Sequence, residues 1–470
     1  MKNILELLPE QSDCITFIGS GEDALIAADV GTGKTVIALT AAQDALRAGK
    51  VTRWLVLAPK LVATDTWAQE PSEWAHLQDL DVAIACGTPA SRLKAVQSDA
   101  PVVVMNYENL PWLLDQFPRG SKKDTLPFDG LICDEIDKLK TVKSNRFKVL
   151  RNRIGVFNKR IGLTGTLIPN DPTELWGQVY MIDGGASMGR SFYKWREKYF
   201  YPIDFNQYKW KPLPDTGQHL LQALDGLCYR LPAQGLPEVC LADPEYLTLP
   251  ESIRSRYREL EREYLLIVED TAGKSRKVDA ANAAVLAGKL QQITAGFSYV
   301  DGTREAVWHS RQRFDWLEKL REKLAGEQLL VFYHFIEELD ELRRRYPKLQ
   351  HLGNGVPTRR ARDAIRRWNA GEISMLALHP SSAGHGLNLQ KSGARHIAFL
   401  TLPWSGGMFR QVTGRLARRG QTARQIFVHT ALCESTVDQA VFERVTQRMA
   451  GMDDFLHTLY QQQIGEQVCY

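Results

Sequence analysis

The sequence predicts an α/β protein with two domains, each built on a parallel β-sheet, and a mainly helical insertion between them. Its 470 residues exceed what one hydrophobic core usually contains. Short apolar runs alternate with helix-length amphipathic segments near both ends of the chain, whereas the middle lacks this alternation. We therefore expect domains at residues 1–185 and 326–470 and an insertion with a linker at residues 186–325.

Six apolar runs predict the strands of the first domain. They are apolar at mostly consecutive positions, which is typical of strands that are buried on both faces. Helix-length segments separate them, so we expect parallel strands with helices on both faces of the sheet. The runs are ALIAADV (24–30), RWLVLAP (53–59), DVAIACG (81–87), PVVVMNY (101–107), DGLICDE (129–135) and KRIGLTGT (159–166).

The same alternation predicts a second parallel sheet near the end of the chain. Between the two sheets, the apolar periodicity of residues 252–270 and 280–297 predicts two long helices. The strands of the second sheet are expected at QLLVFYH (328–334), ISMLALH (373–379), RHIAFLTL (395–402) and RQIFVHT (424–430).

The composition is that of a folded protein, with 44% hydrophobic and 24% charged residues and a net charge of +4. So small a net charge argues neither for nor against nucleic acid as a partner. Seven scattered cysteines without CxxC pairs fit neither a disulfide framework nor a zinc site, and they indicate a reducing compartment. We find no signal peptide and no apolar run long enough for a membrane span, so we expect a cytoplasmic protein without a membrane partner.

A glycine-rich loop between the first expected strand and a helix predicts a phosphate-binding site. The segment AADVGTGKT (27–35) places backbone N–H groups at a helix amino terminus, where they bind phosphates. Lys34 is expected to reach the β- and γ-phosphates of ATP, and Thr35 to offer its hydroxyl to Mg²⁺. Ala28 replaces the first glycine of the usual pattern. The expected nucleotide contacts in the loop are Gly31, Thr32, Gly33, Lys34 and Thr35.

Two acidic residues end a later strand, LICDEID (131–137). Ligands of open parallel sheets bind at the carboxyl ends of the strands, so this position suits a partner of the phosphate loop. We expect Asp134 to hold Mg²⁺ and Glu135 to be the general base for hydrolysis. Alone, such a pair is more often a turn or a cap.

A cluster of arginines, QVTGRLARRGQ (411–421), lies in a stretch without acidic residues from Ser405 to Cys433. Arg415 and Arg418 are three residues apart, about one helical turn, so both can face one cleft. An arginine that stabilises a transferring phosphoryl group typically raises the rate by ~10³-fold or more. The alternative is a solvated basic helix face.

The arginine cluster also resembles the last motif of helicase superfamily two, in the spacing of its Swi/Snf-like branch, at Gln411, Arg415, Arg418, Gly420 and Gln421. Further segments resemble motifs of this family in the same order. They are LPEQ (8–11), LVLAPKLVATDTWAQEPSEW (55–74), DEID (134–137), LTGTLIPNDPTELW (163–176), SSAGHGLNL (381–389) and ESTVD (434–438).

The resemblance implies two RecA-like lobes that form an ATP-driven motor on duplex DNA, in a minimal version like bacterial or phage members. Gln11 and Gln411 would contact the nucleotide, and Thr164 and Thr166 would couple its state to DNA binding. Asp137 and His385 depart from the family pattern, where His and Gly are usual. The residues that would contact DNA on this basis are Lys60, Ser382, Gly384 and His385.

Two basic stretches favour contacts with phosphates, although each alone is usually a solvated face. Nine basic and no acidic residues lie between Lys138 and Arg160, and eight arginines with one aspartate lie between Arg343 and Arg367. The individual residues that we expect to contact DNA are Lys140, Lys143, Arg359 and Arg360. Trp67 and Trp74 are expected to pack within a helix, and Trp404 fits a core position as well as a functional one.

We therefore predict a DNA-dependent ATPase that translocates on double-stranded DNA without reading its sequence. One alternative is a helicase that separates or anneals strands at forks. Another is a motor module that serves a protein partner in replication, repair or a nuclease system. The expected cofactors are ATP and Mg²⁺, and the expected compartment is the cytoplasm of a bacterium or of a phage-infected cell.

Overall fold

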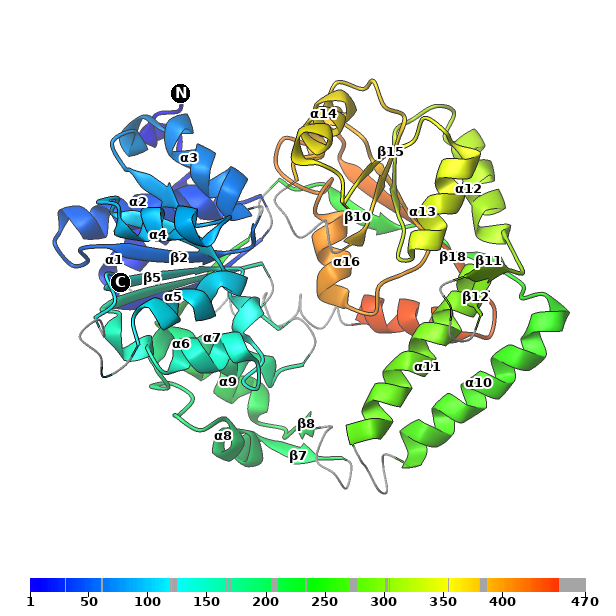
Figure 1. Cartoon of the computed structure of the whole chain (residues 1–470), viewed down its shortest axis with the longest axis horizontal. Coiled ribbons are helices and arrows are strands. Elements are labelled where there is room, and N and C mark those ends of the chain that lie inside the picture. Colours follow the sequence, from blue (N-terminus) through cyan, green and yellow to red (C-terminus); the bar gives the residue numbers. More distant parts are fainter. Residues whose placement is uncertain are drawn as a thin grey trace. The chain divides into compact units, whose positions relative to one another are not determined.

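The computed structural model describes most of the chain, and its α/β class confirms the predicted one (Figure 1). Val30, Thr166 and the segment 381–386 are among the residues that it does not describe. The described part is residues 1–447 apart from 30, 61, 119, 121–124, 166, 169–170, 204–209, 233–234, 271–276, 301–302, 304, 354 and 381–386.

The chain divides into two compact units, which are described separately. The N-terminal unit comprises Met1–Phe200 and Pro212–Gln234, and the C-terminal unit comprises Tyr201–Lys211 and Gly235–Gly451. The segment that we expected between two domains is thus shared, with its first part in the N-terminal unit and its long helices in the C-terminal unit.

In the described part of the N-terminal unit, seven parallel strands form one sheet in the order β3-β4-β2-β5-β6-β1-β9. All six predicted strands are present, and β9 is an addition that lies beside β1. The strands are β1 (Asp23–Ala28), β2 (Trp54–Ala58), β3 (Val82–Ile84), β4 (Val102–Asn106), β5 (Gly130–Asp134), β6 (Lys159–Thr164) and β9 (Cys228–Leu231).

Helices cover both faces of this sheet (Figure 1). Several begin at side chains that accept hydrogen bonds from the first turn, such as Thr88 before α4 and Ser144 before α6. On one face Ile26, Val56 and Ile132 pack against residues of α1 and α2. The helices are α1 (Pro9–Ser20), α2 (Lys34–Arg47), α3 (Trp67–Glu73), α4 (Pro89–Gln97), α5 (Leu110–Gln116), α6 (Asn145–Arg151), α7 (Glu174–Asp183), α8 (Phe192–Tyr199) and α9 (Thr216–Leu224).

Seven described strands of the C-terminal unit form a second parallel sheet, six of them in the order β10-β18-β17-β14-β16-β15, and β11 also pairs with β18. The four predicted strands are its centre. The strands β10, β11 and β15 are short and carry charged or polar residues, so no apolar run marked them in the sequence. The strands are β10 (Glu238–Leu241), β11 (Glu245–Leu247), β14 (Leu329–Phe332), β15 (Gln350–Leu352), β16 (Met375–Leu378), β17 (His396–Phe399) and β18 (Gln425–Cys433).

Alternate residues of these strands face two separate cores. Leu330 and Phe332 pack in one core with residues of α14 and α16, and Leu329 and Val331 pack in the other with residues of α12 and α13. The sheet is therefore buried on both faces, as its continuous apolar runs predict. The helices are α12 (Gln312–Lys323), α13 (Ile336–Arg345), α14 (Thr358–Asn369) and α16 (Gly406–Thr413).

Both long helices that the sequence predicts are present, as α10 (Glu251–Asp270) and α11 (Lys277–Ala295), and they lie side by side (Figure 1). An antiparallel hairpin of β12 (Phe297–Tyr299) and β13 (Ala306–Trp308) follows them. A further small sheet pairs β7 (Phe200–Pro202) with β8 (Trp210–Pro212).

Gly177 allows α7 to pack closely against the segment after β5. A Cβ at this position would lie 2.7 Å from the backbone oxygen of Lys140 and 2.9 Å from that of Leu139. Alanine normally stabilises a helix interior by about 1 kcal/mol relative to glycine. Here we expect Gly177→Ala to lower the free energy of unfolding by about 1–3 kcal/mol, because the backbone cannot move aside cheaply.

Urea-induced unfolding followed by circular dichroism measures this effect. Gly288→Ala in α11 is the control, because a Cβ at Gly288 would meet no atom within 4 Å. An equal or higher unfolding free energy for Gly177→Ala than for the unsubstituted protein would contradict the close packing of α7.

Candidate functional site

The phosphate loop joins the carboxyl end of β1 to α2, and its two glycines adopt positive φ angles. Gly31 has φ 86° and Gly33, the residue before the first turn of α2, has φ 82°. Residues other than glycine rarely adopt this backbone conformation. The ammonium group of Lys34 donates to the backbone oxygen of Ala28 at 3.0 Å, which places its charge against the loop at the helix amino terminus. Thr35 follows in the first turn and is half-buried.

Gln11 of α1 forms a hydrogen bond with this loop. Its amide nitrogen donates to the backbone oxygen of Thr32 at 2.7 Å, and its amide oxygen accepts from the backbone N–H of Leu8 at 2.9 Å. The amide nitrogen would also lie 2.5 Å from a Cβ at Gly33, so the side chain and the loop are in close contact. The expected contact of Gln11 with the nucleotide stays a prediction, but the structure places this residue beside the loop.

Arg230 also contacts the phosphate loop, and the sequence analysis did not predict this contact. It lies on β9 next to β1, and it donates to Asp29 of the loop at 2.8 Å and to the backbone oxygen of Ala27 at 2.9 Å. Its side chain is buried, with 7% of its surface exposed. Nothing in the local sequence around Arg230 indicates this contact, because it depends on the pairing of β9 with β1.

Asp134 ends β5 at the same edge of the sheet, and two aromatic residues hold it. The indole N–H of Trp67 donates to its carboxylate at 2.9 Å, and the hydroxyl of Tyr107 donates to its backbone oxygen at 2.9 Å. Burial, and next the charge of Glu135, raises the pKa of the Asp134 carboxyl, whereas the Trp67 hydrogen bond and the Lys34 charge lower it. A buried carboxylate with an indole donor is fixed in orientation and suits a metal ligand.

Trp67 thus has a role that its helical spacing did not indicate. It is fully buried, as expected for packing within a helix, but its N–H contacts the predicted metal ligand. Trp74 lies just after α3 and not within it, and it donates to Glu70 of that helix at 3.1 Å. The two tryptophans are therefore alike in burial and different in contact.

Glu135 and Asp137 follow in a tight turn. Glu135 has φ 54°, a left-handed conformation that is uncommon for residues other than glycine and frequent at functional sites. Burial, and next the charge of Glu135, raises the pKa of Asp137. Thr164 ends β6 between β5 and β1 and is fully buried, whereas Thr166 lies outside the described residues.

The first basic stretch does not form a uniform basic surface. Lys159 is buried and donates to the backbone oxygens of Ile18 at 2.7 Å and Gly21 at 2.6 Å, and Arg160 pairs with Asp23 at 2.6 Å. These two residues stabilise the fold.

Lys140, which we expected to contact DNA, pairs with Glu174 at 3.1 Å, so its charge is partly compensated. Lys60 and Lys143 are exposed and stay candidates for DNA contacts.

The second basic stretch divides in the same way. Arg343 pairs with Asp340, and Arg344 and Arg345 both pair with Glu341. The hydrogen bond from Arg344 in particular lowers the pKa of the Glu341 carboxyl to about 2. These ion pairs belong to α13 and its surroundings.

Arg359 and Arg360 are exposed in the first turn of α14 and are the part of the second stretch that stays a candidate for DNA contacts.

The arginine motif lies at the end of a helix rather than within one. The helix α16 ends at Thr413, and turns that begin at Gly414 carry Arg415 and Arg418, so our expectation of one helical turn between them is wrong. Arg415 is buried, with 4% of its surface exposed. Gln411 lies in the last turn of α16 and is half-buried.

The structure brings two predicted motifs together at Arg418. Its guanidinium donates to the side-chain oxygen of Asn388 at 2.7 Å and to the backbone oxygen of Leu387 at 3.2 Å, both in the segment 381–389. Ser382, Gly384 and His385, which belong to the same segment, lie outside the described residues.

Comparisons with known proteins show the family of this chain. Residues 15–234 match the model of the SNF2-related domain, and residues 312–420 match that of the helicase conserved C-terminal domain. The chain is 30% identical to protein p41 of Acyrthosiphon pisum secondary endosymbiont phage 1 over 453 residues, which are 92% of this chain and 94% of p41.

More distant relatives include larger proteins. The chain is 25% identical to the SWI/SNF-related matrix-associated actin-dependent regulator of chromatin subfamily A-like protein 1 of Xenopus tropicalis, over 94% of this chain but only 44% of that protein. It is 20% identical to the ATP-dependent helicase YqhH of Bacillus subtilis, over 91% of this chain and 75% of YqhH. A solved structure, the Sulfolobus solfataricus SWI2/SNF2 ATPase core in complex with dsDNA, aligns with a TM-score of 0.43 and 21% identity over 96% of this chain and 92% of that one.

The two sheets, the phosphate loop and the arginine motif define an ATP-hydrolysing enzyme of helicase superfamily two. Within that superfamily the chain belongs to the Swi/Snf-like branch, whose members are DNA-dependent ATPases, and it has the two RecA-like lobes of that branch. In the part of the chain that the structure describes, no helix is both long and apolar enough to cross a membrane.

The contact between Trp67 and Asp134 gives a testable prediction. Trp67→Phe keeps an aromatic ring but removes the donor to the carboxylate. We expect the ATP hydrolysis rate to fall about tenfold and the Mg²⁺ concentration for half-maximal rate to rise, since partners that orient a metal ligand commonly contribute this much.

Steady-state hydrolysis at several Mg²⁺ concentrations measures both quantities. Trp74→Phe loses the same volume from the same segment without touching Asp134, so it is the matched control. Equal rates for the two variants would show that the hydrogen bond to Asp134 has no part in the reaction.

Proposed function

We propose that the protein is a Mg²⁺-ATP-driven translocase on double-stranded DNA that does not read the base sequence. The observation that carries this proposal is the pairing of a phosphate loop with a buried, oriented aspartate at one edge of the first sheet, in a chain of the Swi/Snf-like branch. Its relative in Xenopus is named as a regulator of chromatin, which supports duplex DNA as the track.

In this proposal the N-terminal unit binds the nucleotide. The N–H groups of Gly31, Thr32 and Gly33 and the ammonium of Lys34 bind the phosphates, because an anion is favoured at a helix amino terminus. The hydroxyl of Thr35 and the carboxylate of Asp134 would hold Mg²⁺, which compensates the charge on the phosphate oxygens. Glu135 accepts a proton from the attacking water.

The C-terminal unit supplies the remaining groups. Arg415 and Arg418 would stabilise the charge that develops on the transferring phosphoryl group, and Gln411 would contact the nucleotide. The half-buried position of Arg418 on Asn388 supports this role, because a guanidinium that is held in place loses less entropy when it binds a phosphate.

For DNA we propose contacts with the phosphate backbone rather than with bases. The exposed candidates are Lys60 and Lys143 in the N-terminal unit and Arg359 and Arg360 in the C-terminal unit. Such contacts predict affinity that falls with salt. Thr164 and Thr166 would link the nucleotide to this surface, and Ser382, Gly384 and His385 would add contacts. With a phage protein among its relatives, the cytoplasm of a bacterium or an infected cell is the compartment that we propose.

ATP hydrolysis without nucleic acid and with single-stranded DNA, duplex DNA, a fork and RNA tests the choice of substrate. We expect plain duplex to stimulate hydrolysis most. If only forks or single strands stimulate hydrolysis, the proposed function would change from a translocase to a strand-separating or annealing helicase. If no nucleic acid stimulates ATP hydrolysis although the protein binds ATP, the protein would be a motor module that needs a protein partner in replication, repair or a nuclease system.

Lys34→Ala and Arg418→Ala test the residues assigned to hydrolysis. We expect each to reduce DNA-stimulated hydrolysis by about 10³-fold or more, because each removes a charge that offsets the transferring phosphoryl group. DNA affinity, measured by fluorescence anisotropy at one salt concentration, should change little.

Arg424→Ala is the control for Arg418, since Arg424 is exposed just beyond the same motif. Normal turnover in the Lys34 or Arg418 variant would refute the assignment of that residue.

A further inference from the structure

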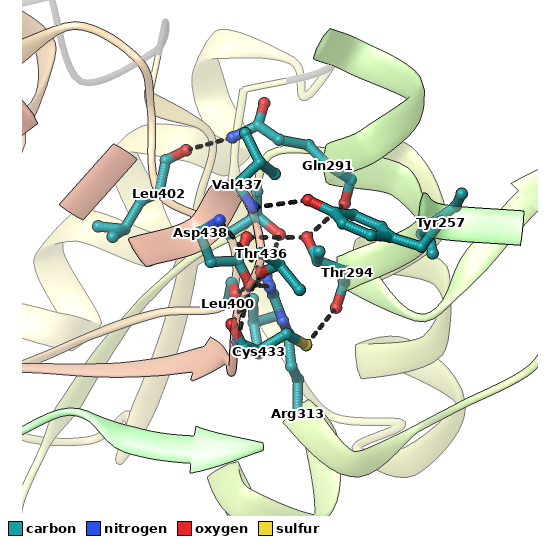
Figure 2. A network of polar contacts seen from close by, with 12 residues as sticks. Tyr257, Gln291, Thr294, Arg313, Leu400, Leu402, Cys433, Thr436, Val437 and Asp438 are labelled. Atoms are coloured by element: carbon teal, nitrogen blue, oxygen red, sulfur yellow. Dashed lines mark hydrogen bonds and ion pairs between the residues drawn. The ribbon is translucent and has the colours of Figure 1, made fainter. Parts of the chain in front are cut away.

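The segment that carries the arginines is attached at both ends to one buried cluster in the C-terminal unit (Figure 2). Arg313 of α12 donates to the backbone oxygen of Leu400, before the segment, and to the carboxylate of Asp438, after it. Arg313 and Asp438 are 3% and 4% exposed. Arg313 therefore joins the two ends of the chain from Leu400 to Asp438, through a hydrogen bond at Leu400 and an ion pair at Asp438. We call this stretch, which includes α16, Arg415 and Arg418, the arginine segment.

The helix α11 of the insertion also contacts the carboxyl-terminal end of the arginine segment, at Asp438. Thr294 donates to Asp438 at 2.8 Å, and Tyr257 of the neighbouring helix α10 accepts from the backbone N–H of Val437 at 2.7 Å (Figure 2). These bonds attach the two long helices to the end of the arginine segment. The insertion is thus part of the packing of the C-terminal unit and not only an appendage.

Gln291, one turn before Thr294 on α11, contacts the beginning of the segment. Its amide nitrogen donates to the backbone oxygen of Leu402 at 3.1 Å, and its amide oxygen accepts from the indole N–H of Trp404 at 2.7 Å. A backbone oxygen only accepts and an indole N–H only donates, so these partners fix the orientation of the amide. Gln291 is 2% exposed, so water does not replace either partner readily.

We propose that Gln291 is a positioning residue for ATP hydrolysis. It fixes Leu402 and Trp404, the residues that lead into α16, and α16 in turn determines where Arg415 and Arg418 lie. The inference rests on the proposed role of these arginines. It assigns to the insertion a function in the reaction, namely to hold the arginine segment from its amino-terminal side.

Gln291 suits a test better than the ion pair does. Removal of Arg313 or Asp438 leaves a buried charge without its partner, which destabilises a fold strongly and would obscure any effect on the reaction. Gln291 is neutral and contacts only the beginning of the segment, so its replacement leaves the ion pair and Thr294 in place.

The experiment measures DNA-stimulated ATP hydrolysis of the full chain for Gln291→Ala, Trp404→Phe and the double variant. We expect kcat to fall about tenfold for Gln291→Ala, with KM for ATP within about twofold, because misplaced arginines affect the transition state more than ATP binding. The double variant should be no slower than the slower single variant, since both substitutions remove the same hydrogen bond between Trp404 and Gln291. Gln292→Ala is the matched control, because Gln292 is the next residue of α11 and is half-buried.

The outcomes separate this inference from the proposed function. A kcat within twofold of the unsubstituted protein for both single variants, or an equal loss in Gln292→Ala, would overturn the role of Gln291. Should Gln291→Ala unfold below the assay temperature, Trp404→Phe decides alone, with a lowered kcat and an unchanged KM expected. If the unsubstituted protein hydrolyses no ATP with any nucleic acid, or if Arg418→Ala is fully active, the proposed function itself fails.

Discussion

Burial of both sheets on both faces decides where polar chemistry can lie in this protein. Strand interiors are mostly apolar, because a buried polar group without a partner costs free energy, so most reactive groups lie at the ends of strands. In the N-terminal unit β5, β6 and β1 are neighbours and parallel. With strands about 4.8 Å apart, the phosphate loop and Asp134 lie on one edge about 10 Å from each other at the level of the strands. The topology alone thus unites segments that are a hundred residues apart in sequence.

This constraint also explains what the sequence could predict. A strand buried on both faces is a continuous apolar run, and a phosphate loop needs glycines at fixed positions, so both features are local and visible. The contacts of Trp67 with Asp134 and of Arg230 with Asp29 are different, because each joins distant segments. Helical spacing indicated that Trp67 would be buried, and it is, but no local pattern distinguishes its partner from that of Trp74.

The basic stretches show the same limit for charge. Counting charges along the chain treats Lys159 and Arg359 alike, although the first is buried on backbone oxygens and the second is exposed. A charge count becomes a statement about a surface only after tertiary ion pairs have been subtracted. Lys143 and the arginines in the first turn of α14 are among the residues that remain exposed after this subtraction.

The polar cluster around Arg313 and Asp438 is costly to bury, and its value lies elsewhere than in stability. Well-packed apolar residues in place of a buried ion pair are often neutral or stabilising by about 1–4 kcal/mol. Apolar packing, however, has little directional preference, whereas hydrogen bonds to Leu400, Leu402 and Asp438 hold only one arrangement. In the proposed reaction Arg415 and Arg418 reach a phosphoryl group, and a misplacement of about 1 Å would lower the rate, so such an arrangement is useful at the ends of their segment. The cluster therefore lies where a directional interaction gains the most, at the two ends of the chain that carries Arg415 and Arg418.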